Sequence, residues 1–500
     1  MELSFQTDTL ECYDLIFSQR VRKEETQDSV VPDTLPDIAE IQCVSGSVLI
    51  RSKDVGAGYI RLESNVPARI CYRAEDTEEL YPLEVNIPFT VNLEDPSIPD
   101  GGICVAEMKL AVLEAKLLNP RKVSVRAAVN FCVDCYFPGQ KIFFGGGERE
   151  AEAIHVREHI AAVTAVSGVS EKTFVLTDEF SVPGEVKNLL SQNTVLLLEE
   201  LKTVGNKLIL KGTAKSDLLV LAQDMSIGSV SFSTGFSQIM ELENMPENAF
   251  LKVNLLLSGS YYDLSGGEER SSTMELHAVA QAVVYSTSEH SCITDAYSNR
   301  FHLETETEEG ELCRIKGADT LRETVRDTLP TAAPVSEVLQ GVVDTGIPQM
   351  EGEDLTLPIT VSVHYRTADG TAAWTRRSLT ARFHHELDPG RYLEIADILT
   401  QEIYLAPGSG GIEMRLPLEI SVFLWEKEPL PLVRGVRFDE TEVLDLSELP
   451  SLVILRGNHD ETLWELAKGN ASTVEAIQEA NALDQPVCPS EMLLIIPKVV

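Results

Sequence analysis

The sequence has 500 residues, of which 43% are hydrophobic and 24% are charged, and its formal net charge is −38 with a pI of about 4.6. A chain of this length exceeds a single hydrophobic core and should divide into about three or four domains. Its negative charge repels phosphate backbones and anionic lipid surfaces, so a nucleic-acid partner and membrane insertion are both disfavoured.

The N-terminal residues give no targeting signal, because no basic segment is followed by an apolar one. No run of about 18 apolar residues occurs further along, so we expect neither export nor a membrane anchor. The nine cysteines are an odd number without regular spacing. That usage is more typical of a reducing cytosol than of a disulfide framework, and a cytoplasmic protein is predicted.

The first predicted elements are strands in which apolar and polar side chains alternate. The apolar members of the first such strand are Val66, Ala68, Ile70 and Tyr72, and a longer alternating strand covers residues 123–133. Each strand has one apolar face. We therefore predict antiparallel sheets packed on a shared core rather than a parallel α/β layout.

Two short motifs near the end of this region contain cysteine or histidine residues at spacings that can occur in metal sites. Cys132 and Cys135 form a C-x-x-C pair, but a spacing of three along a strand sends two side chains to opposite faces. His155 to His159 match the H-x-x-E-H pattern of inverted zincins, whose two histidines share one face of a helix. The segment is strand-like, although a helix over residues 151–162 is an alternative. We predict no metal, no cofactor and no catalytic residue.

The alternating pattern returns twice, at a spacing of roughly 145 residues. A weaker copy covers residues 208–218 and 276–284, and a strong copy covers residues 357–365 and 412–424. Phe89, Phe236 and Phe383 stand at equivalent places, each a few residues before an acidic turn. Three tandem antiparallel β-sandwich-like domains are therefore predicted, over residues 1–140, 150–290 and 293–430.

Beyond residue 450 the pattern predicts a small β-α-α-β domain over residues 451–498. Two apolar runs, 453–455 and 493–496, fit paired strands. Between them, residues 463–467 have helical spacing, with Asp460 as the expected N-cap. A second helix is expected to begin at a capping box formed by Ser472 and Glu475, with Val474 and Ile477 on its buried face.

This last domain resembles the LysM module through Leu455-Arg456-Gly457, Glu461-Thr462-Leu463-Trp464 and the closing apolar strand. The segments that lead into the three copies, at 29–41, 177–186 and 328–339, together with strands such as 208–212, resemble the SPOCS domain of clostridial spore-coat proteins. Three such copies before one LysM module are similar to the family of spore-coat morphogenesis proteins that bind the stage IV sporulation ATPase.

The resemblance implies a non-enzymatic adaptor for spore coat assembly, made in the cytoplasm of the mother cell and recruited to the forespore surface. Its LysM domain would dock on the coat-basement morphogenetic ATPase, and its β domains would contact other coat proteins. The residues that the resemblance assigns to partner or glycan binding are Asp460, Glu461, Thr462, Leu463, Trp464, Pro489, Ser490 and Met492.

Peptidoglycan binding is the alternative function. LysM domains that hold N-acetylglucosamine polymers resemble one another in two loops, Gly-Asp-Thr-Leu and Pro-Gly. Here both glycines are absent, and Asp460 and Ser490 narrow and charge the groove. Metalloprotease activity through His155 and His159 is a third hypothesis, from a different class.

Overall fold

The structure is a computed structural model that describes residues 5–75, 77, 79–147, 153–182, 184–242, 245–246, 248–264, 271–400, 402–445, 450–457, 461–483, 485 and 492–499. Within these residues most of the chain is β-strand, and the two helices are short. The strands pair antiparallel throughout the sheets. The predicted mainly β, antiparallel architecture is therefore confirmed. No helix in this part of the chain is long and apolar enough to cross a membrane.

As far as Val443, the chain repeats one strand plan three times. The first unit contains β1 (Phe5–Val30), β2 (Ile38–Ser45), β3 (Leu49–Gly56), β4 (Tyr59–Ala74), β5 (Leu80–Glu94), β6 (Ile103–Asn119) and β7 (Lys122–Gly147). The second contains β8 (Ile154–Phe180), β9 (Val186–Val204), β10 (Lys207–Ala222), β11 (Ile227–Glu241), β12 (Phe250–Asp263) and β13 (Ser272–Ser298). The third contains β14 (Phe301–Leu329), β15 (Val335–Thr345), β16 (Gln349–Glu351), β17 (Asp354–Thr367), β18 (Ala372–His384), β19 (Arg391–Thr400), β20 (Tyr404–Gly408) and β21 (Gly411–Val443).

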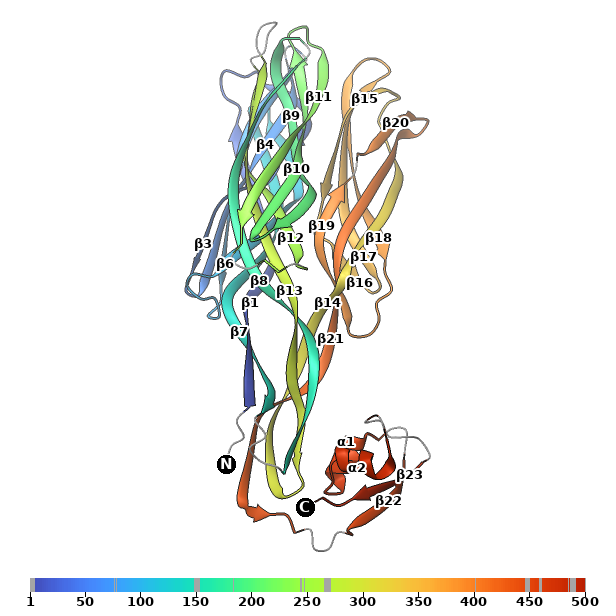
Figure 1. The fold of residues 1–500 in the computed structure, drawn as a ribbon. Coiled ribbons are helices and arrows are strands. Elements are labelled where there is room, and N and C mark those ends of the chain that lie inside the picture. Colours follow the sequence, from blue (N-terminus) through green and yellow to red (C-terminus); the bar gives the residue numbers. More distant parts are fainter. Residues whose placement is uncertain are drawn as a thin grey trace.

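Each unit has two layers of strands around a core, and in the first two units one layer belongs to a shared six-stranded sheet in which β1 lies beside β8. In the first unit β1, β7 and β6 pair side by side, and the other sheet is built around β4. The second unit uses β8, β13 and β12 with a sheet around β10, and the third uses β14, β21 and β19 with a sheet around β17. Three large hydrophobic clusters occupy the units. The units lie beside one another at the broad end of the molecule (Figure 1).

The alternation seen in the sequence sets which side chains enter these cores. The predicted apolar face of β4 is at most 1% exposed, and the equivalent faces of β10 and β17 are also buried. In β21 the predicted face is buried from Ile412 to Val422, but Leu424 is only half-buried. Beyond Val422 the opposite face, with Phe423 and Trp425, becomes the buried one, because the strand leaves its own core and meets the other units there.

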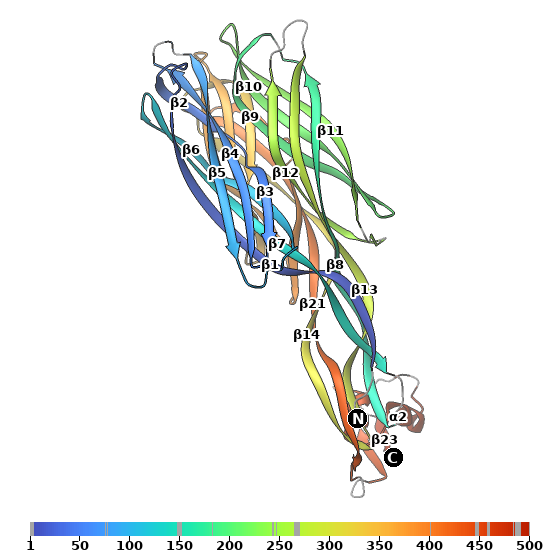
Figure 2. The same ribbon diagram turned by 90° about the vertical axis from the view of Figure 1, so that its left-hand side faces the viewer.

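The strands that close each unit are longer than predicted. The alternation ends at residues 133, 284 and 424, but β7, β13 and β21 continue to Gly147, Ser298 and Val443. The opening strands β1, β8 and β14 are 26, 27 and 29 residues long, and only the strand-like segment 155–159 within β8 has a counterpart among the predicted elements. The lower parts of these six strands form a narrow stalk (Figures 1 and 2). Only small clusters fill the stalk, so its strands carry polar side chains and lack a clean alternation.

A cluster of buried side chains from all three units forms the junction between the units and the stalk: Val105, Tyr136, Val283, Tyr285, Ile315, Ala396, Phe423 and Trp425. Glu394 lies at its edge and accepts hydrogen bonds from Tyr285 Oη at 2.7 Å and Trp425 Nε1 at 3.0 Å. Its carboxylate also pairs with Lys252 Nζ at 3.1 Å. The junction therefore links side chains of the second unit to side chains of the third.

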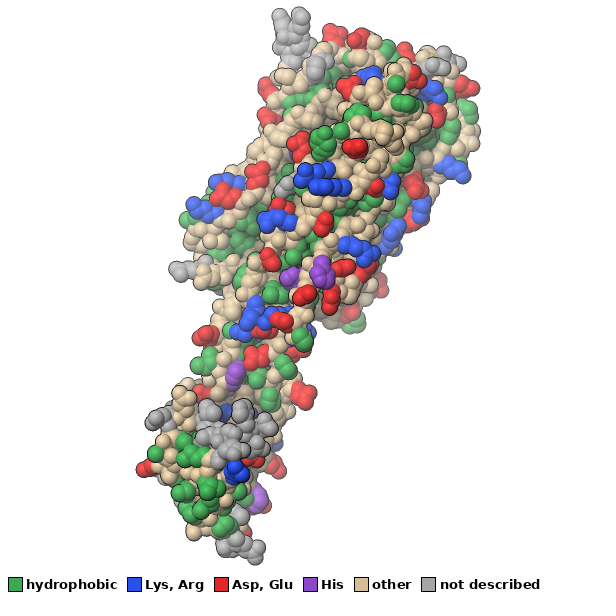
Figure 3. Space-filling model, turned by 90° about the vertical axis from the view of Figure 1, so that its right-hand side faces the viewer, with side chains coloured by type: hydrophobic (Ala, Val, Ile, Leu, Met, Phe, Trp, Pro, Cys, Tyr) green, Lys and Arg blue, Asp and Glu red, His purple; other side chains and the backbone are tan. Residues whose placement is uncertain are grey.

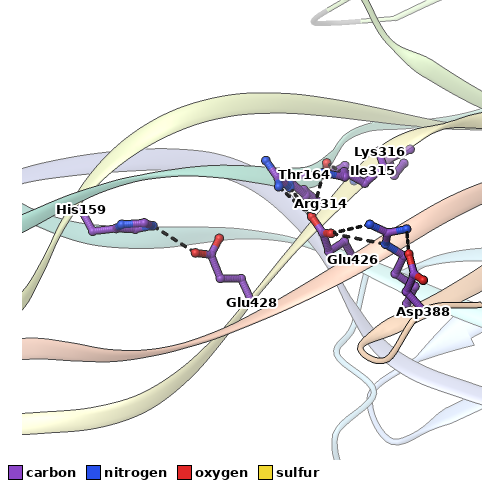
Figure 4. A network of polar contacts seen from close by, with 9 residues as sticks. His159, Thr164, Arg314, Ile315, Lys316, Asp388, Glu426 and Glu428 are labelled. Carbon is purple, nitrogen blue, oxygen red and sulfur yellow. Dashed lines mark hydrogen bonds and ion pairs between the residues drawn. The ribbon is translucent and has the colours of Figure 1, made fainter. Parts of the chain in front are cut away.

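Polar contacts continue this linkage into the stalk (Figure 4). Glu426 of β21 pairs with Arg314 at 2.7 Å, Lys316 at 3.2 Å and Arg391 at 3.3 Å. The hydrogen bonds from Arg314 and Lys316 lower the pKa of Glu426 to about 2. Thr164 of β8 accepts a hydrogen bond from the Ile315 N–H at 2.8 Å, which joins the second unit to the third.

Candidate functional site

The C-terminal module contains β22 (Leu452–Arg456), α1 (Leu463–Gly469), α2 (Val474–Asn481) and β23 (Leu493–Pro497). The two strands pair antiparallel, with Ile454 opposite Ile495. One face of this strand pair packs against the helices. The hydrophobic cluster of the module contains the buried side chains of Leu463, Leu466, Ala467, Ile477, Leu494 and Ile496. So small a core needs nearly all the apolar side chains of the module for packing. An apolar face that stays exposed is therefore unexpected and requires an explanation.

Thr462, rather than Asp460, is the N-cap of α1. Its hydroxyl accepts the Glu465 N–H at 3.2 Å, and the Glu465 carboxylate accepts the Thr462 N–H at 2.9 Å. This reciprocal pair is a capping box, and it forms because α1 begins only at Leu463, where the first buried side chain enters the core. The predicted cap at Asp460 is wrong by two positions.

The predicted capping box of α2 is also wrong. Thr473 is the N-cap, and its hydroxyl accepts the Ala476 N–H at 3.0 Å. Ser472 is fully buried, and its hydroxyl donates to the Pro497 carbonyl. Ser472 therefore ties the start of α2 to the end of β23 instead of capping the helix.

The exposed side of the strand pair is apolar. We call it the outer face; it consists of Leu452, Ile454, Leu493 and Ile495, whose exposed fractions range from 37% to 66%. It exists because both strands are apolar at every position except Arg456, while only one of their faces meets the helices. Met492, at 42% exposed, adjoins it in sequence. Figure 3 shows hydrophobic side chains gathered on the module, at the narrow end of the molecule.

Another side of the module is docked on the stalk through Trp464. The Trp464 ring lies edge-on to Tyr297 of β13, with 4.8 Å between ring centroids, and Arg157 of β8 lies 5.8 Å from its centroid. Tyr297 belongs to the buried cluster of the module, and its hydroxyl donates to the Ser472 carbonyl at 3.0 Å. This contact holds the module against the stalk with packing and directed hydrogen bonds.

Asp295 is the charged centre of this docking contact. Its carboxylate accepts a hydrogen bond from Trp464 Nε1 at 2.8 Å and pairs with Lys468 at 2.9 Å. A register shift in β13 between Ile293 and Asp295 interrupts the regular alternation of the strand at this point. Burial opposes ionisation of Asp295, but the hydrogen bonds from Lys468 and Trp464 outweigh it, and the pKa of its carboxyl lies below the usual value.

Replacing Asp295 with alanine should loosen the docked module. The change removes two charge-assisted hydrogen bonds, each of which contributes about 1.5–3 kcal/mol. We expect faster hydrogen exchange of the α1 amides in the full chain, measured by mass spectrometry, while the three units keep their protection. Glu289→Ala, at an exposed position of the same strand, is the matched control. Unchanged exchange of α1 in the Asp295 variant would show that the contact does not hold the module.

The residues predicted for partner binding fall into three groups. Asp460, Pro489 and Ser490 lie outside the described residues. Glu461 and Thr462 are exposed at the start of α1, and Met492 is exposed beside β23. Leu463 is fully buried in the module core and Trp464 is engaged by the stalk, so neither offers a free surface to a partner. Sequence reasoning missed the outer face, although its signal was present in two runs, 452–455 and 493–496, that are apolar on both faces.

The H-x-x-E-H segment lies in strand β8, so the alternative of a helix is excluded. His155 packs against Tyr297 with 5.0 Å between ring centroids, and His159 Nε2 is 3.2 Å from Glu428 (Figure 4). On a strand, residues four apart are about 13 Å from one another. Among the described residues, no group of three or more His, Cys, Asp or Glu side chains is arranged to hold a metal ion.

We compared the chain with known proteins. No family model, no curated protein sequence and no solved structure matches it.

Proposed function

We propose that this protein is an assembly adaptor of the spore coat, built from three tandem SPOCS-like β-sandwich domains and a C-terminal LysM domain. It acts in the mother cell at the forespore surface. The module docks there on the coat-basement morphogenetic ATPase, and the three units offer their surfaces to other coat proteins. The proposal rests on the sequence resemblance, and the role requires no chemistry from the chain.

The outer face of the module is the observation that carries the proposal. Single exposed aliphatic side chains are common on protein surfaces, but a contiguous apolar face marks an interaction site. Here four large aliphatic side chains share one side of a two-stranded sheet. A sugar polymer is held by several placed polar groups in a groove, whereas this face presents four aliphatic side chains and one polar side chain, Arg456, at its edge. A protein surface is therefore the better fit, and central apolar side chains would supply most of its binding energy.

Capture by the purified ATPase tests the proposal. Ile454→Asp and Leu493→Asp each place a charge in the middle of the outer face, and each should weaken capture at least about tenfold. Ile160→Asp is the matched control, because Ile160 is equally exposed but lies on the stalk. Truncation after Pro450 should abolish capture. Undiminished capture by the truncated chain would contradict docking through the module.

Sedimentation with insoluble peptidoglycan distinguishes the alternative function. The proposal predicts that the full chain stays in the supernatant, with or without the change at Ile454. Co-sedimentation that is lost on truncation after Pro450 would favour glycan binding by the module instead.

A further inference from the structure

A serine, a histidine and an aspartate form a hydrogen-bonded chain on the stalk, away from the module. Ser288 Oγ lies 2.7 Å from His290 Nε2, and His290 Nδ1 lies 2.6 Å from the Asp8 carboxylate. Ser288 and His290 are two positions apart on β13, and strand geometry places such residues on the same face. Asp8 comes from β1, the opening strand of the first unit.

The partner of Nδ1 decides which nitrogen of His290 carries the proton. An ionised carboxylate only accepts hydrogen bonds, so in the neutral imidazole Nδ1 holds the hydrogen that is donated to Asp8. Nε2 is then left with a lone pair directed at the Ser288 hydroxyl. This is the arrangement in which a histidine can take the proton of a serine nucleophile, with the third group fixing the tautomer.

The surroundings hold the imidazole in place and leave the serine within reach of solvent. His290 is 6% exposed, and its ring stacks on Phe143 with 4.3 Å between centroids and 14° between planes. Phe143 is the strand partner of Asp8 in β7, so one register fixes both neighbours of the ring. Ser288 is half-buried, and Asp8 stands at the surface. The base is thus shielded by an aromatic ring, whereas Ser288 keeps partial exposure to solvent.

We propose that Ser288 is an activated nucleophile that accepts acyl groups from activated carboxylic esters, with His290 as general base and Asp8 as its positioning residue. Ser288 Oγ forms a bond to the carbonyl carbon while its proton passes to His290 Nε2. The bond from that carbon to the leaving oxygen then breaks, and the proton is returned to the leaving alcohol. Ser288 holds the acyl group as an ester, which water cleaves by the same steps to release the carboxylic acid.

The expected rate is modest. General-base assistance contributes about 10²–10⁴-fold. The cleft of about 760 Å³ beside the junction does not include Ser288 in its walls. The substrate class is therefore a reactive ester at the stalk surface rather than a ligand that the cleft would select. The reactivity of Ser288 is independent of the proposed adaptor role, and a test of one does not test the other.

Labelling of the full chain with a fluorophosphonate, mapped by mass spectrometry of peptides, tests the proposal. The serine oxygen displaces fluoride from phosphorus, so the mass of the labelled peptide identifies the nucleophile. We expect labelling of Ser288 in the wild type and in Ser286→Ala, a matched serine on the same face of β13, and none at residue 288 in Ser288→Ala. Hydrolysis of p-nitrophenyl acetate should fall in parallel.

Asp8→Asn provides the second variant, because Asp8 is 57% exposed and its replacement should preserve the fold. An amide at this position can hold the wrong tautomer, so labelling of Ser288 should slow at least about tenfold. Absence of label on Ser288 in the wild type would overturn the proposal. Labelling of Ser288 at the same rate in Asp8→Asn would overturn the roles of His290 and Asp8.

Discussion

Replacing Trp425 with alanine should lower the free energy of unfolding by about 3–5 kcal/mol. Trp425 is 7% exposed at the junction, stacks on Tyr392 at 5.9 Å between centroids and meets Tyr285 edge-on at 5.7 Å. Its removal leaves a cavity among side chains of different units and takes a hydrogen-bond donor from Glu394. Urea unfolding followed by circular dichroism should show the first transition at a lower midpoint.

Trp425→Phe separates the two contributions. Phenylalanine keeps an aromatic ring between Tyr285 and Tyr392 but loses the N–H that Glu394 accepts. The free energy of unfolding should fall by about 1.5–3 kcal/mol, since one hydrogen bond to a charged group is lost. Equal losses for the two variants would mean that the hydrogen bond, and not the packing, stabilises the junction.

Lowering the pH from 6.5 towards 4 should reduce stability through His364. This residue is 8% exposed on β17, between its strand neighbours Gln340 and Trp374. Burial lowers its pKa from 6.5 to about 4, so the unfolded chain binds more protons in this range. The stabilising contribution is complete above pH 6.5 and is lost as the pH falls through about 4. Its full size is about 3 kcal/mol.

Asp344 acts in the opposite direction over nearly the same range. Burial raises the pKa of its carboxyl from 3.8 to about 6, so the folded chain binds more protons between these values and gains stability as the pH falls. Asp344 keeps some contact with solvent, and its effect should be smaller than that of His364. The two contributions partly cancel in the wild type.

The single variants reveal the two contributions. Relative to the wild type, Asp344→Asn should lose more stability between pH 6.5 and 4, and His364→Leu should lose less. Urea midpoints at a series of pH values measure both. Parallel pH curves for His364→Leu and the wild type would show that His364 does not titrate in this range.

The cores of the three units could be predicted because the order of apolar and polar residues within each strand is enough to identify its buried face. Alternation with a period of two fixes which side chains enter a core, whatever the neighbouring strand is. That is why the faces of β4, β17 and β21 follow the sequence pattern to Val422. The paired strands of the module and the two helices between them were also predictable from local signals, namely two short apolar runs and a helical spacing of apolar residues.

The stalk could not be predicted, because its stabilisation is not local. Strands β1, β8 and β14 have mixed polar faces and become strands by pairing with β7, β13 and β21, more than 80 positions away along the chain. The helix caps were misplaced for a smaller reason. A cap is decided by the residue at which the helix enters the core, and Thr462 and Thr473 stand at those positions.

The sequence by itself therefore determined the class of fold, the repeated strand faces and the existence of a small mixed domain at the end of the chain. The tertiary structure alone decided which surfaces are free and which side chains meet. It left the outer face uncovered, turned Trp464 towards Asp295 from 169 positions away and brought Asp8 to His290 across 282 positions. Periodicity records only whether a side chain is buried, whereas contacts between distant strands depend on register and twist, which no single segment encodes.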